Sequence, residues 1–156
     1  MRMMMSKLKL TVNEVKTRVC YLPEEKFDFL GYTFGRCYSM RRGRFYMGTV
    51  PSQKRVQRIC RAISDETGRD TVSPKAMVEK LNRMLIGWAN YFCLGAVSKA
   101  YSAVDLHARR RLRRWLCDKH EEARPGYKLF PEASLHCVYG LVQLPHRTAS
   151  LPWAKA

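Results

Sequence analysis

The strongest constraint on the fold is a helical repeat of apolar residues between positions 52 and 116. Val56, Ile59 and Ile63 keep the i, i+3, i+7 spacing of one buried stripe. Two further stripes follow, one formed by Met77, Leu81, Met84, Leu85, Trp88 and Phe92, the other by Tyr101, Val104, Ala108, Leu112 and Trp115. Ser52 and the pair Ser73-Pro74 are typical residues for helix starts. Three amphipathic helices with short connections predict a compact bundle.

The residues before this repeat favour strands. The stretch Thr17–Leu22 is rich in β-prone residues, and the runs 26–40 and 45–50 flank a turn at Gly43. Two or three strands alone are marginal in water, so we expect this hairpin to pack on the helices. The predicted class is mainly α with a small β region, in which an N-terminal β-hairpin precedes a three-helix bundle and an irregular tail.

The chain is therefore expected to comprise three parts, at residues 1–50, 51–120 and 121–156. The last part contains Pro125, Pro131, Pro145 and Pro152, which interrupt regular structure. We expect one short helix near residues 131–139 and extended chain elsewhere in this tail.

The charge of the chain suggests an anionic partner. Its 29 Lys and Arg residues against 13 Asp and Glu residues give a net charge of +16. Like charges oppose compaction, and such an excess is usually retained because an anion neutralises it. Nucleic acid is the first candidate, and an anionic membrane surface or simple solubility are the alternatives.

Three basic clusters are candidates for phosphate contacts. The first contains Arg109, Arg110, Arg111, Arg113 and Arg114, the second Lys54, Arg55, Arg58 and Arg61, and the third Arg36, Arg41, Arg42 and Arg44. The guanidinium group matches phosphate geometry well. The alternative for the first cluster is a solvated face paired with Asp105 and Asp118. Near the third cluster, Tyr32, Tyr38 and Tyr46 are candidates either for stacking on bases or for cross-strand packing.

The sequence predicts no active site of its own. It has no glycine-rich phosphate loop, no Asp-Asp or Asp-x-Asp pair to hold two metal ions, and no nucleophile elbow. Its six cysteines are too far apart for a zinc site, and His136-Cys137 is the only directly adjacent pair of Cys and His. We therefore predict no catalytic residue and no metal ligand. Dispersed cysteines and the absence of a signal peptide or membrane span indicate a cytoplasmic protein with buried thiols.

The stretch KLNRMLIGWANYF adds a more specific indication. It resembles the signature helix of the maturase-specific domain of group II intron reverse transcriptases, through Asn82, Gly87, Trp88, Tyr91 and Phe92. The three aromatic residues are expected in the core. Gly87 is expected to allow close helix packing beside Trp88, and Asn82, like Asn90, to hydrogen-bond neighbouring loops.

Further motifs extend the resemblance over nearly the whole chain. Asn13 with Lys16-Thr17 is similar to a box at the end of the palm in these enzymes, and Phe29-Leu30-Gly31-Tyr32 is similar to their primer-grip turn. The run from Asp105 to Trp115 is similar to their arginine-rich helix. By this resemblance, Lys16 holds a turn near phosphate and Gly31 allows a nucleic-acid strand to approach closely.

The resemblance also has a gap, because the metal-binding Tyr-x-Asp-Asp box and the fingers are missing. It implies the edge of the palm plus a thumb, which binds intron RNA in splicing and clamps template–primer in a whole enzyme. The implied partners are group II intron RNA or an RNA/DNA duplex, and a separate chain carrying fingers and palm. The complete enzyme uses Mg²⁺, whereas this chain alone is expected to bind no cofactor and to be inactive as a polymerase. The alternatives are a subunit of a split reverse transcriptase and a decayed fragment of one.

Overall fold

The computed structural model describes residues 7, 9, 19–39, 42–68, 72–120 and 126–150. Its elements are, in order, β1 (Phe27–Phe29), β2 (Tyr32–Ser39), β3 (Arg44–Pro51), α2 (Gln53–Glu66), α3 (Pro74–Tyr91), α4 (Ser98–Lys119), α5 (Gly126–Leu129), α6 (Glu132–Cys137), α7 (Leu144–Arg147) and the 3-10 helix η1 (Thr148–Ser150). The fold is mainly helical with a small antiparallel sheet near the N-terminus, so the predicted class is confirmed.

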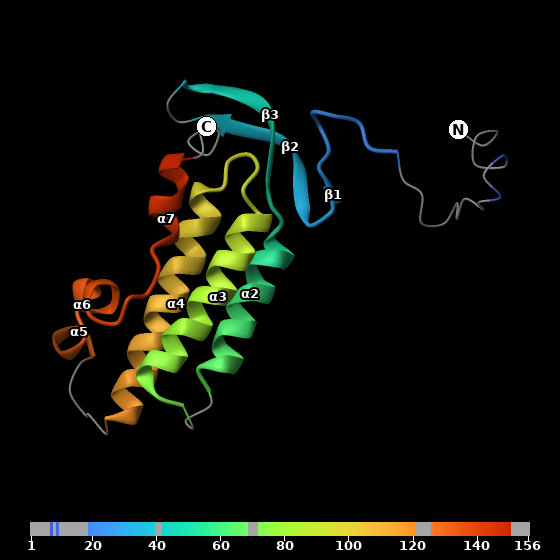
Figure 1. Ribbon diagram of the computed structural model, residues 1–156. Coiled ribbons are helices and arrows are strands. Elements are labelled where there is room, and N and C mark those ends of the chain that lie inside the picture. The colour runs from blue at the N-terminus through green and yellow to red at the C-terminus, as the bar shows by residue number, and fades with distance from the viewer. Residues whose placement is uncertain are drawn as a thin grey trace.

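The three long helices lie side by side, and the sheet lies across one end of them (Figure 1). The short helices α5, α6 and α7 lie along α4 on the side away from α2 (Figure 1). Helix α4 contacts α2, α3 and all three short helices. The longest helix is therefore the centre of the helical region.

The sheet has the order β1-β2-β3, with Phe29 opposite Tyr32 and Ser39 opposite Arg44. Leu30 and Gly31 form the two-residue turn between β1 and β2, with φ values of 50° and 85°. Positive φ at both central residues is typical of the turns whose twist matches that of the flanking strands. Gly43, with φ of 59°, lies in the turn between β2 and β3, as predicted.

The strand predicted over Thr17–Leu22 is wrong for residues 19–22, which are described and form no strand. The Glu25 N–H donates to the Tyr21 carbonyl at 2.9 Å and closes a turn. Pro23 lies inside this turn and has no N–H to give to a sheet ladder. The local turn therefore overrides the β propensity of the segment.

The predicted helix faces form one core. Ile63, Leu81, Val104 and Leu112 are fully buried, and the other residues predicted on the three stripes are buried or partly buried against them. Ser73 caps α3 as predicted, because its Oγ accepts the Ala76 N–H at 3.3 Å. Apolar periodicity therefore places this core correctly.

The tail adds more to this core than predicted. The helix expected near 131–139 is confirmed as α6, but α5, α7 and η1 occupy stretches that were expected to be extended. Leu135, Leu141 and Leu144 are buried together with the residues of the long helices. The core thus lies on both sides of the expected boundary at residue 120.

Candidate nucleic-acid interface

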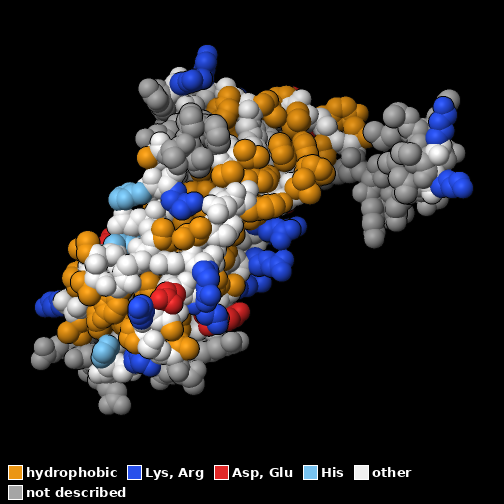
Figure 2. Space-filling model, in the orientation of Figure 1, with side chains coloured by type: hydrophobic (Ala, Val, Ile, Leu, Met, Phe, Trp, Pro, Cys, Tyr) orange, Lys and Arg blue, Asp and Glu red, His pale blue; other side chains and the backbone are white. Residues whose placement is uncertain are grey.

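A row of cations occupies the solvent-facing side of α2. We call Lys54, Arg55, Arg58 and Arg61 the α2 row; all four side chains are exposed. They recur at helical spacing, and the 1.5 Å rise per residue spreads them over about 10 Å. Figure 2 shows Lys and Arg side chains along the edge of the molecule at α2, next to the apolar side chains of the sheet. The row is thus open to an extended anion.

The position of the row is electrostatically unusual. The first turn of α2 contains Lys54 and Arg55 and no acidic residue. Unpaired N–H groups and the helix dipole already make a helix N-terminus positive, so cations there destabilise the helix by about 0.3–1 kcal/mol each. The only carboxylates of the helix are Asp65 and Glu66 at its other end. At this end of α2 the side-chain charges and the helix dipole both attract an anion. The same side chains in the middle of a helix would attract it less strongly.

Three of the five predicted α4 arginines contact the protein itself. The Nε of Arg111 donates to Thr67 Oγ1 at 2.9 Å, and the Nε of Arg113 donates to the Phe130 carbonyl at 2.8 Å. Arg113 is only 8% exposed. Arg109 forms ion pairs with Asp105 and Glu132. These three side chains stabilise the junctions between α4 and its neighbours.

The other two α4 arginines face solvent. Arg110 is exposed, and Arg114 forms only a long ion pair of 3.9 Å with the exposed Asp118. Both border a hollow of about 290 Å³, which is lined by Arg110, Arg113, Arg114, Cys117, Gly126 and Tyr127. Arg110 and Arg114 are therefore the members of this cluster that are available to an external phosphate.

Two motifs that are some 60 residues apart in the sequence meet at the sheet end of the helices. The Tyr32 hydroxyl donates to the Tyr91 carbonyl at 2.7 Å, and the Tyr91 hydroxyl donates to the Leu30 carbonyl at 3.0 Å. Burial raises the pKa of the Tyr32 hydroxyl above its ordinary value. Its ring also contacts that of Phe92, with centroids 5.2 Å apart. The β1–β2 turn is thus held against the end of the signature helix.

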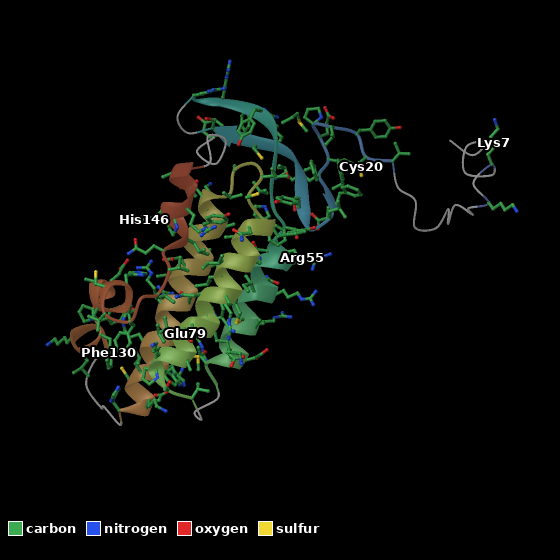
Figure 3. All side chains as sticks on the ribbon, in the orientation of Figure 1. Lys7, Cys20, Arg55, Glu79, Phe130 and His146 are labelled. Carbon is green, nitrogen blue, oxygen red and sulfur yellow. The ribbon has the colours of Figure 1, made fainter. Side chains whose placement is uncertain are left out.

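The start of α2 completes this junction. The Ser52 N–H donates to the Gly31 carbonyl at 2.9 Å, whereas the Ser52 side chain makes no cap. A Cβ added at Gly31 would lie 3.0 Å from Arg55 Nε and 3.2 Å from Phe92 Cζ. Figure 3 shows Arg55 at the start of α2, beside the strands. In this structure, the close neighbours of Gly31 are protein side chains.

The expectation for Gly87 is wrong. We expected this glycine to permit close helix packing, yet it is exposed, and an added Cβ would meet nothing within 4 Å. The neighbouring aromatic residues Trp88 and Phe92 face the core as expected, whereas Tyr91 is largely exposed, so the expected core position is wrong for Tyr91. Gly87 therefore lies on an open face of α3, where no other described element packs against it.

Sequence reasoning missed the full extent of the links between the helices and the tail. Asn82 donates to the Gly140 carbonyl and accepts the Val142 N–H, both at 2.9 Å, so its expected role toward a loop is confirmed. Asn90 accepts from Arg147 at 2.8 Å. The buried Asp105 accepts the Leu144 N–H at 3.0 Å. The available sequence signal was the position of Asp105 on the apolar stripe of its helix, four residues after Tyr101 and next to Val104.

The third basic cluster and the tyrosines near it are only partly exposed to solvent. Tyr32 is buried and Tyr46 is half-buried, whereas Tyr38 is 49% exposed. Arg36, Arg42 and Arg44 are exposed. Arg41 and the predicted palm residue Lys16 lie outside the described residues, as do Asn13 and Thr17.

The described residues also bear on metal sites, membrane-spanning helices and disulfides. Within that part of the chain, no three His, Cys, Asp or Glu side chains gather as metal ligands. None of its helices combines the length and apolar character that a membrane span requires. The six cysteines form no disulfide, but none is fully buried, so the expectation of buried thiols is wrong.

The comparison with known families connects these features. Residues 56–129, which run from the first turn of α2 to the end of α5, match the family Group II intron, maturase-specific domain. No curated protein matches the chain. The matched segment contains Arg58 and Arg61 of the α2 row, the signature helix α3 with its five motif residues, and the arginines of α4; Lys54 and Arg55 precede it. Residues 56–129 are therefore recognised as a group II intron maturase-specific domain, which implies a role in intron splicing and RNA binding.

Proposed function

We propose that the chain binds group II intron RNA through the α2 row, with Arg110 and Arg114 as a second contact, and that this binding assists splicing. The observation that carries the proposal is the exposed α2 row, which begins just before the segment matched to the maturase-specific domain and continues into it, with cations in the first turn where the helix itself disfavours them. Structured RNA is recognised mainly through its shape and its backbone. A row of exposed cations with no carboxylate in the first turn of its helix suits that mode of recognition.

Arg109, Arg111 and Arg113 have a smaller part in this proposal. Each contacts protein groups, so an RNA contact would require it to leave a partner. Replacing them would alter the fold as well as binding. They serve the proposal indirectly, by fixing α4 beside α2 and the tail.

The test is binding of the purified chain to a group II intron RNA and to an unrelated structured RNA of equal length, across a salt series. We expect tighter binding to the intron that persists as salt rises. Equal and steeply salt-dependent binding to both RNAs would reduce the protein to a nonspecific polycation.

Matched variants locate the contact. Lys54→Gln with Arg58→Gln removes two charges from the α2 row, and Lys75→Gln with Lys128→Gln removes two exposed charges elsewhere. Each lost phosphate contact lowers the slope of log K against log salt by about 0.7–0.9. The magnitude of this slope should fall by about 1.4–1.8 in the variant with Lys54→Gln and Arg58→Gln. It should change little in the variant with Lys75→Gln and Lys128→Gln. Equal falls in both pairs would refute a localised contact.

A second candidate is a subunit of a split reverse transcriptase that clamps template–primer. It is favoured by Phe29 and Leu30, which are exposed at the primer-grip-like turn beside Arg55. The chain would be mixed with a second chain that carries the fingers and the metal-binding aspartates, and primer extension would be measured with Mg²⁺. Primer extension that requires both chains would support this candidate. Primer extension by the second chain alone, at the same rate as with both chains, would refute it.

A further inference from the structure

The outer end of the β2–β3 hairpin presents aromatic rings to solvent. Tyr38 and Phe45 lie opposite each other on the two strands and are 49% and 56% exposed. Their ring centroids are 5.0 Å apart in an edge-on arrangement. The guanidinium carbon of Arg36 lies 3.8 Å from the centroid of Phe45. We call Arg36, Tyr38 and Phe45 the hairpin cluster.

The charge around this cluster is entirely positive. Residues 32–51 contain four arginines and no Asp or Glu. Arg42 and Arg44 are exposed near the tip, and no described carboxylate forms an ion pair with them or with Arg36. Figure 2 shows apolar side chains over the sheet, with the Lys and Arg side chains of the α2 edge next to them. An occupant of this end must therefore be anionic and must also offer flat apolar faces.

Unpaired RNA meets both requirements. A duplex keeps its bases stacked inside and offers phosphates to arginine, but it offers no face to an exposed ring. Unpaired bases stack on aromatic side chains and on guanidinium planes, while their phosphates contact nearby cations. Both kinds of partner lie together in the hairpin cluster and its neighbours.

We propose that the β2–β3 hairpin is a second RNA-binding surface, specific for unpaired segments. Bases stack on Tyr38, Phe45 and Arg36, and phosphates contact Arg42 and Arg44. This inference rests on the proposed function, because it deepens RNA binding by the same chain. It differs in ligand, since the α2 row binds the backbone of structured RNA and the hairpin cluster binds exposed bases.

The test uses the whole chain and two fluorescein-labelled probes, a 12-nucleotide oligo(U) and a 12-base-pair RNA duplex, followed by anisotropy. Phe45→Ala and Tyr38→Ala should each weaken oligo(U) binding about 5- to 100-fold, the range for losing one stacked base. Duplex binding should change by less than about 2-fold. The matched control is Tyr21→Ala, which removes an exposed tyrosine outside the hairpin.

Two further variants at Phe45 separate stacking from packing. Phe45→Trp keeps a flat ring and should retain oligo(U) binding, whereas Phe45→Leu keeps apolar area without a ring and should lose it. Equal affinity of all variants for oligo(U), or equal losses on the duplex, would overturn the proposal. Binding to anionic lipid vesicles without binding to oligo(U) would overturn it as well.

The two proposals fail separately. Lys54→Gln with Arg58→Gln should lower duplex and intron binding while the effect of Phe45→Ala on oligo(U) persists. If the chain binds the intron RNA no more tightly than an unrelated RNA, the proposed function fails. The oligo(U) measurement still decides whether the hairpin binds unpaired RNA.

Discussion

The helical part and the strand part of this molecule are held together in different ways. Helices α2, α3 and α4 share one core with the tail, and buried hydrogen bonds from Asp105 and Tyr101 link segments distant in sequence. The three strands instead expose much of their aromatic surface and meet the helices at a few contacts, notably Tyr32 and Gly31.

The difference separates stability from recognition. The helical part buries polar groups that hold it, such as Asp105 and Arg113, and leaves the α2 row exposed. The strand part leaves its rings outside, where monomeric proteins usually avoid clustered apolar surface unless it binds something. Changes in the first part should therefore alter unfolding, and changes in the second should mainly alter binding, except at the junction between them.

Asp105→Ala should have the largest effect on the helical part. The substitution leaves Arg109 with one partner fewer and the Leu144 N–H without its acceptor. Breaking a buried ion pair costs about 3–5 kcal/mol, and urea unfolding should show a loss of that size. Asp118→Ala, in an exposed pair, is the control and should cost less than about 1 kcal/mol. A small effect of Asp105→Ala would mean that the tail is not held through this carboxylate.

Gly31→Ala tests the junction between the two parts. Gly31 has φ of 85°, and its Cβ would crowd Arg55 and Phe92. A left-handed conformation costs a residue with a Cβ about 1–2 kcal/mol, so the free energy of unfolding should fall by at least that amount. An unchanged thermal midpoint would show that the turn is not fixed against the helices.

Tyr101→Phe tests a buried hydroxyl of the helical core. The Tyr101 hydroxyl donates to the Ala89 carbonyl at 2.8 Å, and its loss should cost about 0.5–1.5 kcal/mol. Burial raises the pKa of Tyr101 to about 12, above its ordinary value of 10.0. The unfolded chain therefore ionises first, and this contribution is complete below pH 10 and is lost as pH rises toward 12. The stability difference between the two proteins should shrink and then reverse over that range, because two pKa units correspond to about 2.7 kcal/mol. A constant difference would contradict the assignment.

Gly87→Ala should have the smallest effect and the opposite sign. Space for a methyl group is open, and alanine stabilises an exposed helix by about 0.4–1 kcal/mol relative to glycine. The thermal midpoint should rise. If intron binding falls in the same variant, the exposed glycine allows the RNA backbone to approach α3; if binding is unchanged, the RNA lies elsewhere.

The sequence predicted what depends on short-range periodicity. The stripes through Ile63, Leu81 and Leu112 and the cap at Ser73 follow from spacing within one helix. The Gly31 turn was found through its resemblance to a known motif, but the contacts of Gly31 with Arg55 and Phe92 involve a different segment.

The candidate site was harder to predict for the same reason. Five arginines on α4 look alike in the sequence, and their partners lie in other segments, such as Thr67 for Arg111 and Phe130 for Arg113. Charge alone does not tell an arginine that binds its own chain from one that faces solvent. Gly87 was misinterpreted because a helical glycine is equally compatible with a crowded face and an open one.

The contacts between tail and helices also have a consequence for synthesis on the ribosome. Asn82 and Asp105 form hydrogen bonds with backbone groups at positions 140–144, which are synthesised some 40 to 60 residues later. A nascent chain that ends at residue 129, where the matched segment ends, has made all three long helices and still lacks the leucines that close their core. A chain that stalls before position 135 would therefore leave the apolar side chains that contact these leucines in the folded protein without their partners.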